Sequence, residues 1–171
     1  MPKRTQARAH EASAAIARFV GQQQAVASNV WVLVADRARA RLFEFASSGQ
    51  KLVEIACFDN PEARIHGIAR DRLPRVNESS DGIRHAIEPR TTMMEKSVDR
   101  FARSLIDELE NGRTQQRYDQ LILVAPPRFR GALHRHVDKP LKNCISAEIS
   151  RDLTTWPVER IFEQLQPRPT T

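Results

Sequence analysis

The stretch that decides the fold is VWVLVADRARARLFEF, residues 30–45. Residues 30–35 are continuously apolar, which is typical of a strand buried on both faces of a sheet. Residues 40–45, ARLFEF, predict a second strand after a tight connection. Two strands joined so closely should pair antiparallel. The connection itself carries Asp36, Arg37 and Arg39, whose role the rest of the sequence has to decide.

The remaining strands follow from the same patterns. After a Ser-Ser-Gly turn, KLVEIACF (51–58) alternates like an edge strand and should complete an antiparallel meander. DQLILVA (119–125) is again continuously apolar and should be central, whereas CISAEIS (144–150) alternates and should form the other edge.

Three helices are predicted between and after these strands. One begins at a capping box of Thr92 and Glu95 and ends at Gly112. The second opens at Pro126-Pro127 and carries Phe129, Leu133 and Val137, and the third spans residues 157–165. The order β-β-β-α-β-α-β-α with right-handed crossovers predicts a mixed five-stranded α/β sheet in the order 3-2-1-4-5, with helices on both faces. This is the ribonuclease-H-like arrangement.

The chain of 171 residues predicts a single domain at 29–166 between an N-terminal arm, 1–28, and a short tail, 167–171. Ile16, Phe19 and Val20 have helical spacing, so the arm is predicted either as a short helix docked on the body or as a frayed tail. Residues 60–90 are rich in Pro, Gly, Asn and Ser and predict a long loop, which in a compact domain usually serves a function.

The composition favours an acidic partner. Lys and Arg number 27 against 21 Asp and Glu, a formal charge of +6, which suits nucleic acid or a membrane surface. The bias toward arginine also has a bland explanation in a genome rich in G and C. Cys57 and Cys144 lie in apolar runs, as expected of free thiols in a reducing cytoplasm. No apolar run is long enough to span a membrane, and no secretory signal is recognised.

Ligands of open α/β sheets gather beyond the carboxyl ends of the strands, where the strand order reverses. Asp36, the Pro126 helix start and Asp152 are expected there. A two-metal nuclease would need more carboxylates than this edge offers, so Asp36 is interpreted as a turn residue that caps backbone amides. Asp36 and Asp152 remain a candidate polar site, and no catalytic residue, metal ligand or cofactor is predicted.

Residues 126–142 carry basic side chains opposed only by Asp138, beginning at a helix N-terminus that could bind an anion. A solvated basic helix face is an equally common explanation. The candidate phosphate or nucleic-acid contacts are Arg37, Arg39, Arg75, Arg84, His85, Arg128, Arg130, Arg135, Lys139, Lys142 and Arg151.

Several of these segments together resemble the bacterial host attachment protein family. They are WVLVADRARARLFEF, NPEARIHGIARDR, DGIRHAIEPR, DRFARSLIDELE, YDQLILVAPPRFRGALHRHV and AEISRDLTTWPVERI, spread over about residues 31–165. The resemblance implies a distant similarity to the middle domain of archaeal and eukaryotic peptide release factors and of Pelota, with a ribonuclease-H-like fold. The Gly-Gly-Gln triplet of those factors is absent from residues 64–90, so their catalysis is not implied. Pro74 replaces an expected glycine and restricts the backbone, which argues against a loop contact to phosphate there.

The charge, the long loop and this resemblance lead to a leading prediction of a non-catalytic, cytoplasmic, RNA- or ribosome-associated protein. The alternative is an interaction protein needed for attachment to host cells or surfaces, directly or through regulation. A cryptic metal-dependent hydrolase at Asp36 and Asp152 is a third hypothesis. The sequence does not decide the oligomeric state.

Overall fold

The computed structural model describes residues 29–46, 51–63 and 84–166, with side chains in the first helix of the last range described from residue 93 onward. The strands are β1 (Val30–Ala35), β2 (Arg39–Phe45), β3 (Leu52–Asp59), β4 (Gln120–Val124) and β5 (Ile145–Ile149). The helices are α3 (Arg84–Thr114), α4 (Pro127–His134), α5 (Lys139–Cys144) and α6 (Val158–Leu165).

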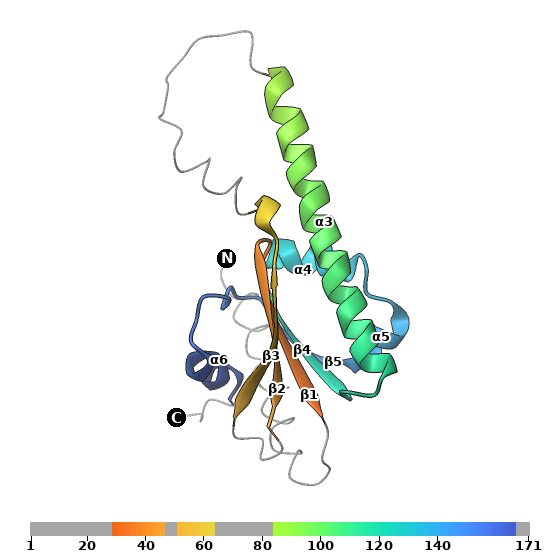
Figure 1. Cartoon of the computed structure of the whole chain (residues 1–171), viewed down its shortest axis with the longest axis vertical. Helices are drawn as coiled ribbons and strands as arrows, with labels where there is room; N and C mark the ends of the chain where they lie inside the picture. Colours follow the sequence, from red (N-terminus) through yellow and green to blue (C-terminus); the bar gives the residue numbers. More distant parts are fainter. Residues whose placement is uncertain (1–28, 47–50, 64–83, 167–171) are drawn as a thin grey trace, which may run out of the picture.

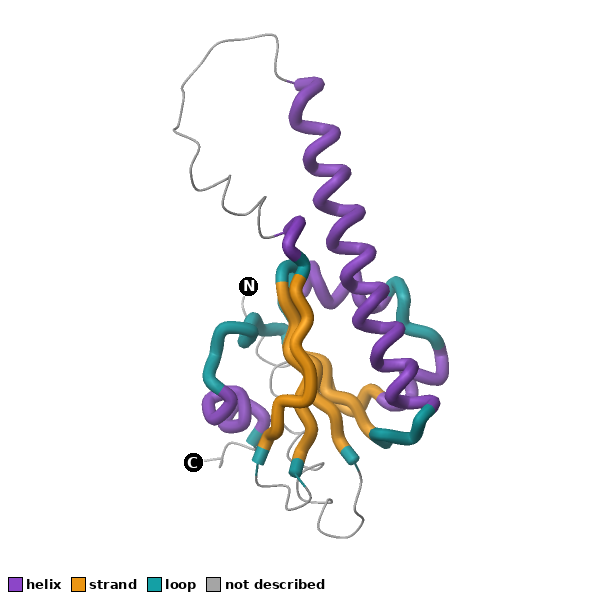
Figure 2. The backbone as a smooth tube through the Cα atoms, in the orientation of Figure 1, coloured by secondary structure: helices purple, strands orange, loops and turns teal. Residues whose placement is uncertain are grey.

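The five strands form one mixed sheet in the order β3-β2-β1-β4-β5 (Figures 1 and 2). β1 pairs with β2 and β2 pairs with β3 antiparallel, whereas β1 and β4, and β4 and β5, run parallel. The predicted α/β class and strand order are therefore confirmed. The parallel strands end at one edge of the sheet, here called the carboxyl edge.

β1 separates two apolar layers, because its side chains alternate between the faces. Trp31 and Leu33 join the core under α3, α4 and α5, and Val32 and Val34 join the core under α6. In Figure 1, α3 and α6 lie on opposite sides of the sheet. The uninterrupted apolar run of β1 is the direct consequence of this double burial.

α3 differs from its prediction at both ends. It begins at Arg84, eight residues before the predicted capping box at Thr92, and continues past Gly112 to Thr114. A helix of 31 residues is about 46 Å long, whereas a strand of six residues spans about 20 Å. The first part of α3 therefore extends well beyond the carboxyl edge, as Figure 1 shows.

Gly112 allows α3 to approach the sheet closely. A Cβ atom at this position would lie 2.5 Å from Cη2 of Trp31 and 3.2 Å from Cε1 of Tyr118. The Trp31 ring stacks on Tyr118 with centroids 4.6 Å apart, and Tyr118 donates a hydrogen bond to the Leu109 carbonyl oxygen at 2.8 Å. Gly112 is thus required by packing rather than by helix termination.

The helix ends through Gln116, which has a left-handed backbone with φ of 55°. The amide of Arg117 donates to the carbonyl of Gly112, and the amide of Gln116 donates to the carbonyl of Arg113. This pair of bonds is the Schellman motif, in which glycine is the usual residue at the left-handed position.

The predicted helix after β4 is divided in two. α4 ends at His134, so Val137 lies in the connection, and Asp138 then caps α5 by accepting a hydrogen bond from the Leu141 amide at 2.8 Å. Asp138 followed by Pro140 at the start of a helix is a typical N-terminal signal. The helix predicted at 157–165 and the edge strand β5 are confirmed within one residue of their ends.

Candidate functional site at the carboxyl edge

Asp36 closes the turn between β1 and β2. Its Oδ1 accepts hydrogen bonds from the amides of Ala38 at 2.6 Å and Arg39 at 2.8 Å, and its own amide donates to the Arg39 carbonyl. This local arrangement is the Asx turn that short polar side chains favour. The geometry agrees with the interpretation of Asp36 as a residue that caps backbone amides.

The other oxygen of Asp36 connects this turn to the segment after β5. Oγ1 of Thr154 lies 2.9 Å from Asp36 Oδ2 and 2.8 Å from Asp152 Oδ1, and the Thr154 amide also donates to Asp152. Thr154 is buried although it lies in a connection. The carboxyl-edge clamp, defined as Asp36, Asp152 and Thr154, therefore joins the β1–β2 turn to the β5–α6 connection.

The Thr154 hydroxyl contacts two carboxylates but has one proton to donate. A threonine hydroxyl has a single hydrogen, and an ionised carboxylate only accepts, so Thr154 can donate to Asp36 or to Asp152 but not to both. Within the described residues, no group of three or more His, Cys, Asp or Glu side chains is placed to hold a metal ion. The hydroxyl and the turn amides thus hydrogen-bond to both oxygens of Asp36 and to Oδ1 of Asp152, three of the oxygens that a two-metal nuclease would use.

The basic candidates near this edge differ in exposure. Arg37 in the turn and Arg128 at the start of α4 are exposed. Arg39 belongs to β2 rather than to the turn, and it is only partly exposed. Arg151 donates to Gln164 Oε1 on α6 at 2.7 Å. The prediction that Arg39 projects from the turn is therefore wrong, because β2 begins one residue earlier than ARLFEF.

Three further candidates cannot be compared in this way. Arg75 lies outside the described residues, and Arg84 and His85 form the start of α3, where only the backbone is described. The backbone does correct one prediction, because residues 84–90 are helical rather than part of the long loop.

Acidic side chains from neighbouring elements oppose the basic segment 126–142. Arg130 on α4 donates to Ser150 Oγ at 2.6 Å and lies 3.4 Å from Glu148 on β5. His134 approaches the same carboxylate, with Nε2 at 3.1 Å from Glu148 Oε1. No local pattern indicates this contact, because Glu148 is brought to α4 only by the pairing of β4 with β5.

Asp99 on α3 is the carboxylate that lies against the basic side chains just after α4. Arg135 donates to Asp99 Oδ1 at 2.7 Å, and Nε2 of His136 lies 3.1 Å from that oxygen without hydrogen-bond alignment. The hydrogen bond from Arg135 holds the pKa of Asp99 below its ordinary value. The segment that looks one-signed in sequence is therefore partly neutralised in the fold.

The two lysines of the segment do not share the edge with Arg128. Lys139 and Lys142 lie on α5, which ends at Cys144 immediately before β5 begins. β5 runs parallel to β4, so its start lies at the opposite edge of the sheet. The structure consequently separates Arg128 and Arg130 from the lysines instead of joining them into one basic surface.

Arg41 forms a polar cluster that the sequence did not predict as a site. It ion-pairs with Glu54 on β3 and donates to the Trp156 carbonyl at 2.7 Å. The Cys57 thiol also donates to Glu54. The hydrogen bond from Arg41 lowers the pKa of Glu54, and the hydrogen bond to Glu54 raises the pKa of Cys57. Arg41 thus fixes the connection before α6 over the sheet.

Comparison with known proteins places these features in a family. Residues 31–165 match the model of a family described as "Protein required for attachment to host cells". The chain is also 31% identical over 98 residues to an uncharacterized protein of Rickettsia prowazekii (strain Madrid E), a match that covers 56% of this chain. It spans 65% of that relative's length. In the described part of the chain, no helix is long and apolar enough to cross a membrane.

The family match overturns the leading prediction of an RNA- or ribosome-associated protein. The family description concerns attachment to host cells, which agrees with the alternative prediction. The structure supplies a physical reason why the charge misled. Arg130 and Arg135 belong to the segment 126–142, which has one acid of its own in sequence, but each of them lies against a carboxylate from another element of the fold.

Proposed function

Because the chain belongs to the family of proteins required for attachment to host cells, we propose that it is an interaction protein on which that attachment depends. The match over residues 31–165 is the observation that carries the proposal, because it includes all five described strands apart from the first residue of β1. We propose that the protein acts by binding and not by catalysis. The hydrogen bonds to both oxygens of Asp36 in the carboxyl-edge clamp support this part.

The surface we assign to partner binding lies on β3, which pairs only with β2 among the described strands and forms an edge of the described sheet. Free strand edges accept further strands from other chains. Val53 is 45% exposed on this strand. Val53 pairs with Glu44 on β2, and the two neighbours of Glu44 along that strand, Phe43 and Phe45, point into the core under α6. Because side chains alternate along a strand, Glu44 and Val53 project from the opposite side of the sheet, which is the α3 side.

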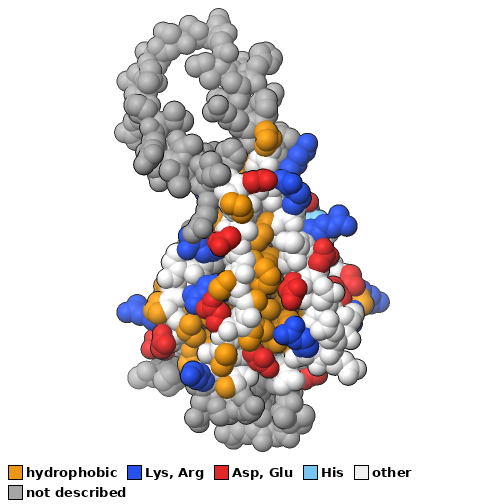
Figure 3. All heavy atoms as spheres, in the orientation of Figure 1, with side chains coloured by type: hydrophobic (Ala, Val, Ile, Leu, Met, Phe, Trp, Pro, Cys, Tyr) orange, Lys and Arg blue, Asp and Glu red, His pale blue; other side chains and the backbone are white. Residues whose placement is uncertain are grey.

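Other partly buried apolar side chains continue this surface. The apolar stripe, as named here, comprises Val53, Ile55, Ala56 and Phe58 on β3 with Val98 on α3. Figure 3 shows apolar side chains running down the face between the sheet and α3. Contiguous exposed apolar surface of this kind is typical of protein–protein contacts. An extended segment of a protein partner would pair with β3 and place its apolar side chains on the stripe.

Complementation of a strain that lacks the protein tests this surface. Val53→Glu should reduce adhesion to cultured host cells, because it places a charge on the apolar stripe. Asn143→Glu adds the same charge to an exposed position of α5 and should restore adhesion fully. Circular dichroism establishes that both variants fold. Full adhesion with folded Val53→Glu would remove the stripe from the proposal.

We further propose that the protein exerts this effect from the cytoplasm. Both described cysteines, Cys57 and Cys144, are free thiols, and free thiols persist in a reducing compartment. Cell fractionation with a cytoplasmic marker tests the location. A pool at the cell surface that is accessible to added protease would reverse this part of the proposal and favour direct contact with the host cell.

The distant similarity to the middle domain of peptide release factors and Pelota is retained as a proposal about the fold alone. The strand order β3-β2-β1-β4-β5 is consistent with a ribonuclease-H-like fold. Superposition of an experimental structure on those domains would test it, and a different connectivity would refute it.

A further inference from the structure

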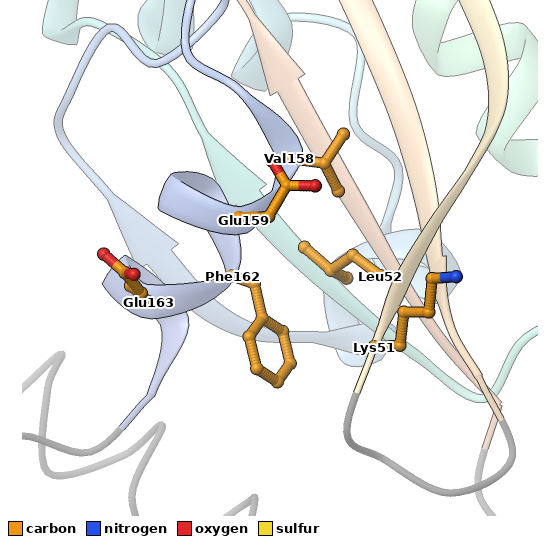
Figure 4. A pocket seen from close by; sticks show the side chains of 6 residues that line it. All are labelled: Lys51, Leu52, Val158, Glu159, Phe162 and Glu163. Atoms are coloured by element: carbon orange, nitrogen blue, oxygen red, sulfur yellow. The ribbon is translucent and has the colours of Figure 1, made fainter.

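A groove opens on the α6 side of the sheet, away from the apolar stripe. It is lined by Lys51, Leu52, Val158, Glu159, Phe162 and Glu163. Figure 4 shows Leu52 and the Phe162 ring turned toward the space between α6 and the start of β3. Phe162 also contacts Phe45 of the core, with ring centroids 6.1 Å apart. The floor of the groove is therefore apolar and packs against the core.

The size of the groove limits what can fill it. Its volume is about 240 Å³, below the ~300–1,000 Å³ of small-molecule pockets. A space of this size suits one large side chain presented by a peptide segment. The rim carries Glu159 and Glu163, both exposed, against the single Lys51. A segment with an apolar anchor and basic neighbours would match both features.

We propose that the N-terminal arm of this same chain, residues 1–28, occupies the groove with Phe19 as its anchor. Ile16, Phe19 and Val20 have the spacing of one apolar helix face. The arm contains the basic residues Lys3, Arg4, Arg8 and Arg18 and a single acid, Glu11. Its charge is thus opposite to that of the rim, and Arg18 adjoins the anchor.

The attachment point of the arm lies beside the groove. Trp31, Glu44 and Val53 form one row across β1, β2 and β3. Two strand spacings separate the ends of this row, about 10 Å. Asn29, which joins the arm to β1, comes two residues before Trp31, and Lys51 comes two residues before Val53. Asn29 and Lys51 therefore lie at the same edge of the sheet. The residues between Phe19 and Asn29 can span up to about 33 Å, so the anchor reaches the groove without strain.

A disulfide-trapping experiment on the full chain tests this docking. Both native cysteines are first replaced, as Cys57→Ser and Cys144→Ala, and Arg18→Cys is then combined with Glu163→Cys on the rim. The matched control combines Arg18→Cys with Arg103→Cys, an exposed position of α3 on the other side of the sheet. Docking should make the rim pair form an intramolecular disulfide roughly tenfold faster than the control pair in dilute protein. Equal rates would overturn the inference.

Hydrogen–deuterium exchange supplies an independent measurement on protein without added cysteines. Phe19→Asp should accelerate amide exchange in residues 158–165, because α6 would lose its cover, and should leave β4 unchanged. Unchanged exchange in α6 would overturn the inference. So would disulfide-linked dimers as the main product of the rim pair, because the occupant would then be the arm of a second copy.

Discussion

The close approach of α3 to the sheet gives a sharp test of the structure through Gly112→Ala. Alanine normally stabilises a helix interior relative to glycine by up to about 1 kcal/mol. Here the added methyl group would lie 2.5 Å from Trp31 Cη2, whereas carbon atoms pack at about 3.5–4.0 Å. α3 and the ring would have to separate by roughly 1 Å.

Trp31 has little freedom to make that room. It is 1% exposed and stacks on Tyr118, and the guanidinium carbon of Arg117 lies 4.9 Å from the ring centroid. Overpacking of a core typically costs about 1–3 kcal/mol, which exceeds the gain in helix propensity. We expect Gly112→Ala to lower the free energy of unfolding by roughly 1–2 kcal/mol.

Gly131→Ala in α4 is the matched control. It also adds one methyl group to a helical glycine, but no described atom beyond the adjoining residues and the local helix backbone lies within 4 Å of the new position. We expect it to raise the free energy of unfolding by roughly 0.5–1 kcal/mol. Urea denaturation followed by circular dichroism measures both variants, and two-state behaviour allows the free energies to be compared.

A double-mutant cycle identifies the contact itself. Trp31→Phe removes the part of the indole that carries Cζ3 and Cη2, so Gly112→Ala should cost less in that background, with a coupling of about 1 kcal/mol or more. If Gly112→Ala instead stabilises the protein as Gly131→Ala does, α3 does not pack on Trp31 as described.

Substitutions at three other positions probe the turn, the helix end and the Arg41 cluster. Asp36→Ala should lower the free energy of unfolding, measured by urea denaturation, by roughly 1–3 kcal/mol. Asp36→Asn should be tolerated, because the asparagine amide can donate to Thr154 and leave the threonine hydroxyl proton for Asp152. A larger loss of stability with Asn than with Ala would contradict the clamp. Gln116→Gly should raise the free energy of unfolding by roughly 0.5–1 kcal/mol by relieving the left-handed backbone, and a loss of stability would argue against the Schellman motif. The hydrogen bond from Arg41 lowers the folded-state pKa of Glu54. The ionised Glu54 side chain therefore stabilises the fold fully above the ordinary pKa of a glutamate, and this stabilisation is lost as pH falls through the folded-state pKa. Glu54→Gln should therefore be less stable than wild type at pH 7 and approach it in acid, and a deficit that does not shrink would refute the linkage.

The central strands could be predicted because they are buried on both faces. β1 and β4 are continuously apolar, and their neighbours alternate, so burial alone fixed which strands lie at the centre and which at the edges. The start of α3 could not be predicted in this way. Pro89 and the polar residues before it indicated a loop, and the Thr92–Glu95 pair occurs here inside a helix rather than at its start.

The candidate site was predictable only where its contacts are local. Asp36 caps amides two and three residues away, so its role could be derived from the turn sequence. Thr154 reaches Asp36 across 118 residues, and Glu148 meets Arg130 only through strand pairing. Such partners depend on the tertiary fold, and this explains why the basic segment was interpreted as an RNA-binding surface.

Attachment to host cells is the most direct test of the proposed function. The number of bacteria bound per cultured host cell is measured for the parent strain, a strain lacking this protein and the same strain with the protein restored. We predict that attachment falls when the protein is absent and returns to the parental value when it is restored. Equal attachment by all three strains, at equal growth, would contradict the proposed function.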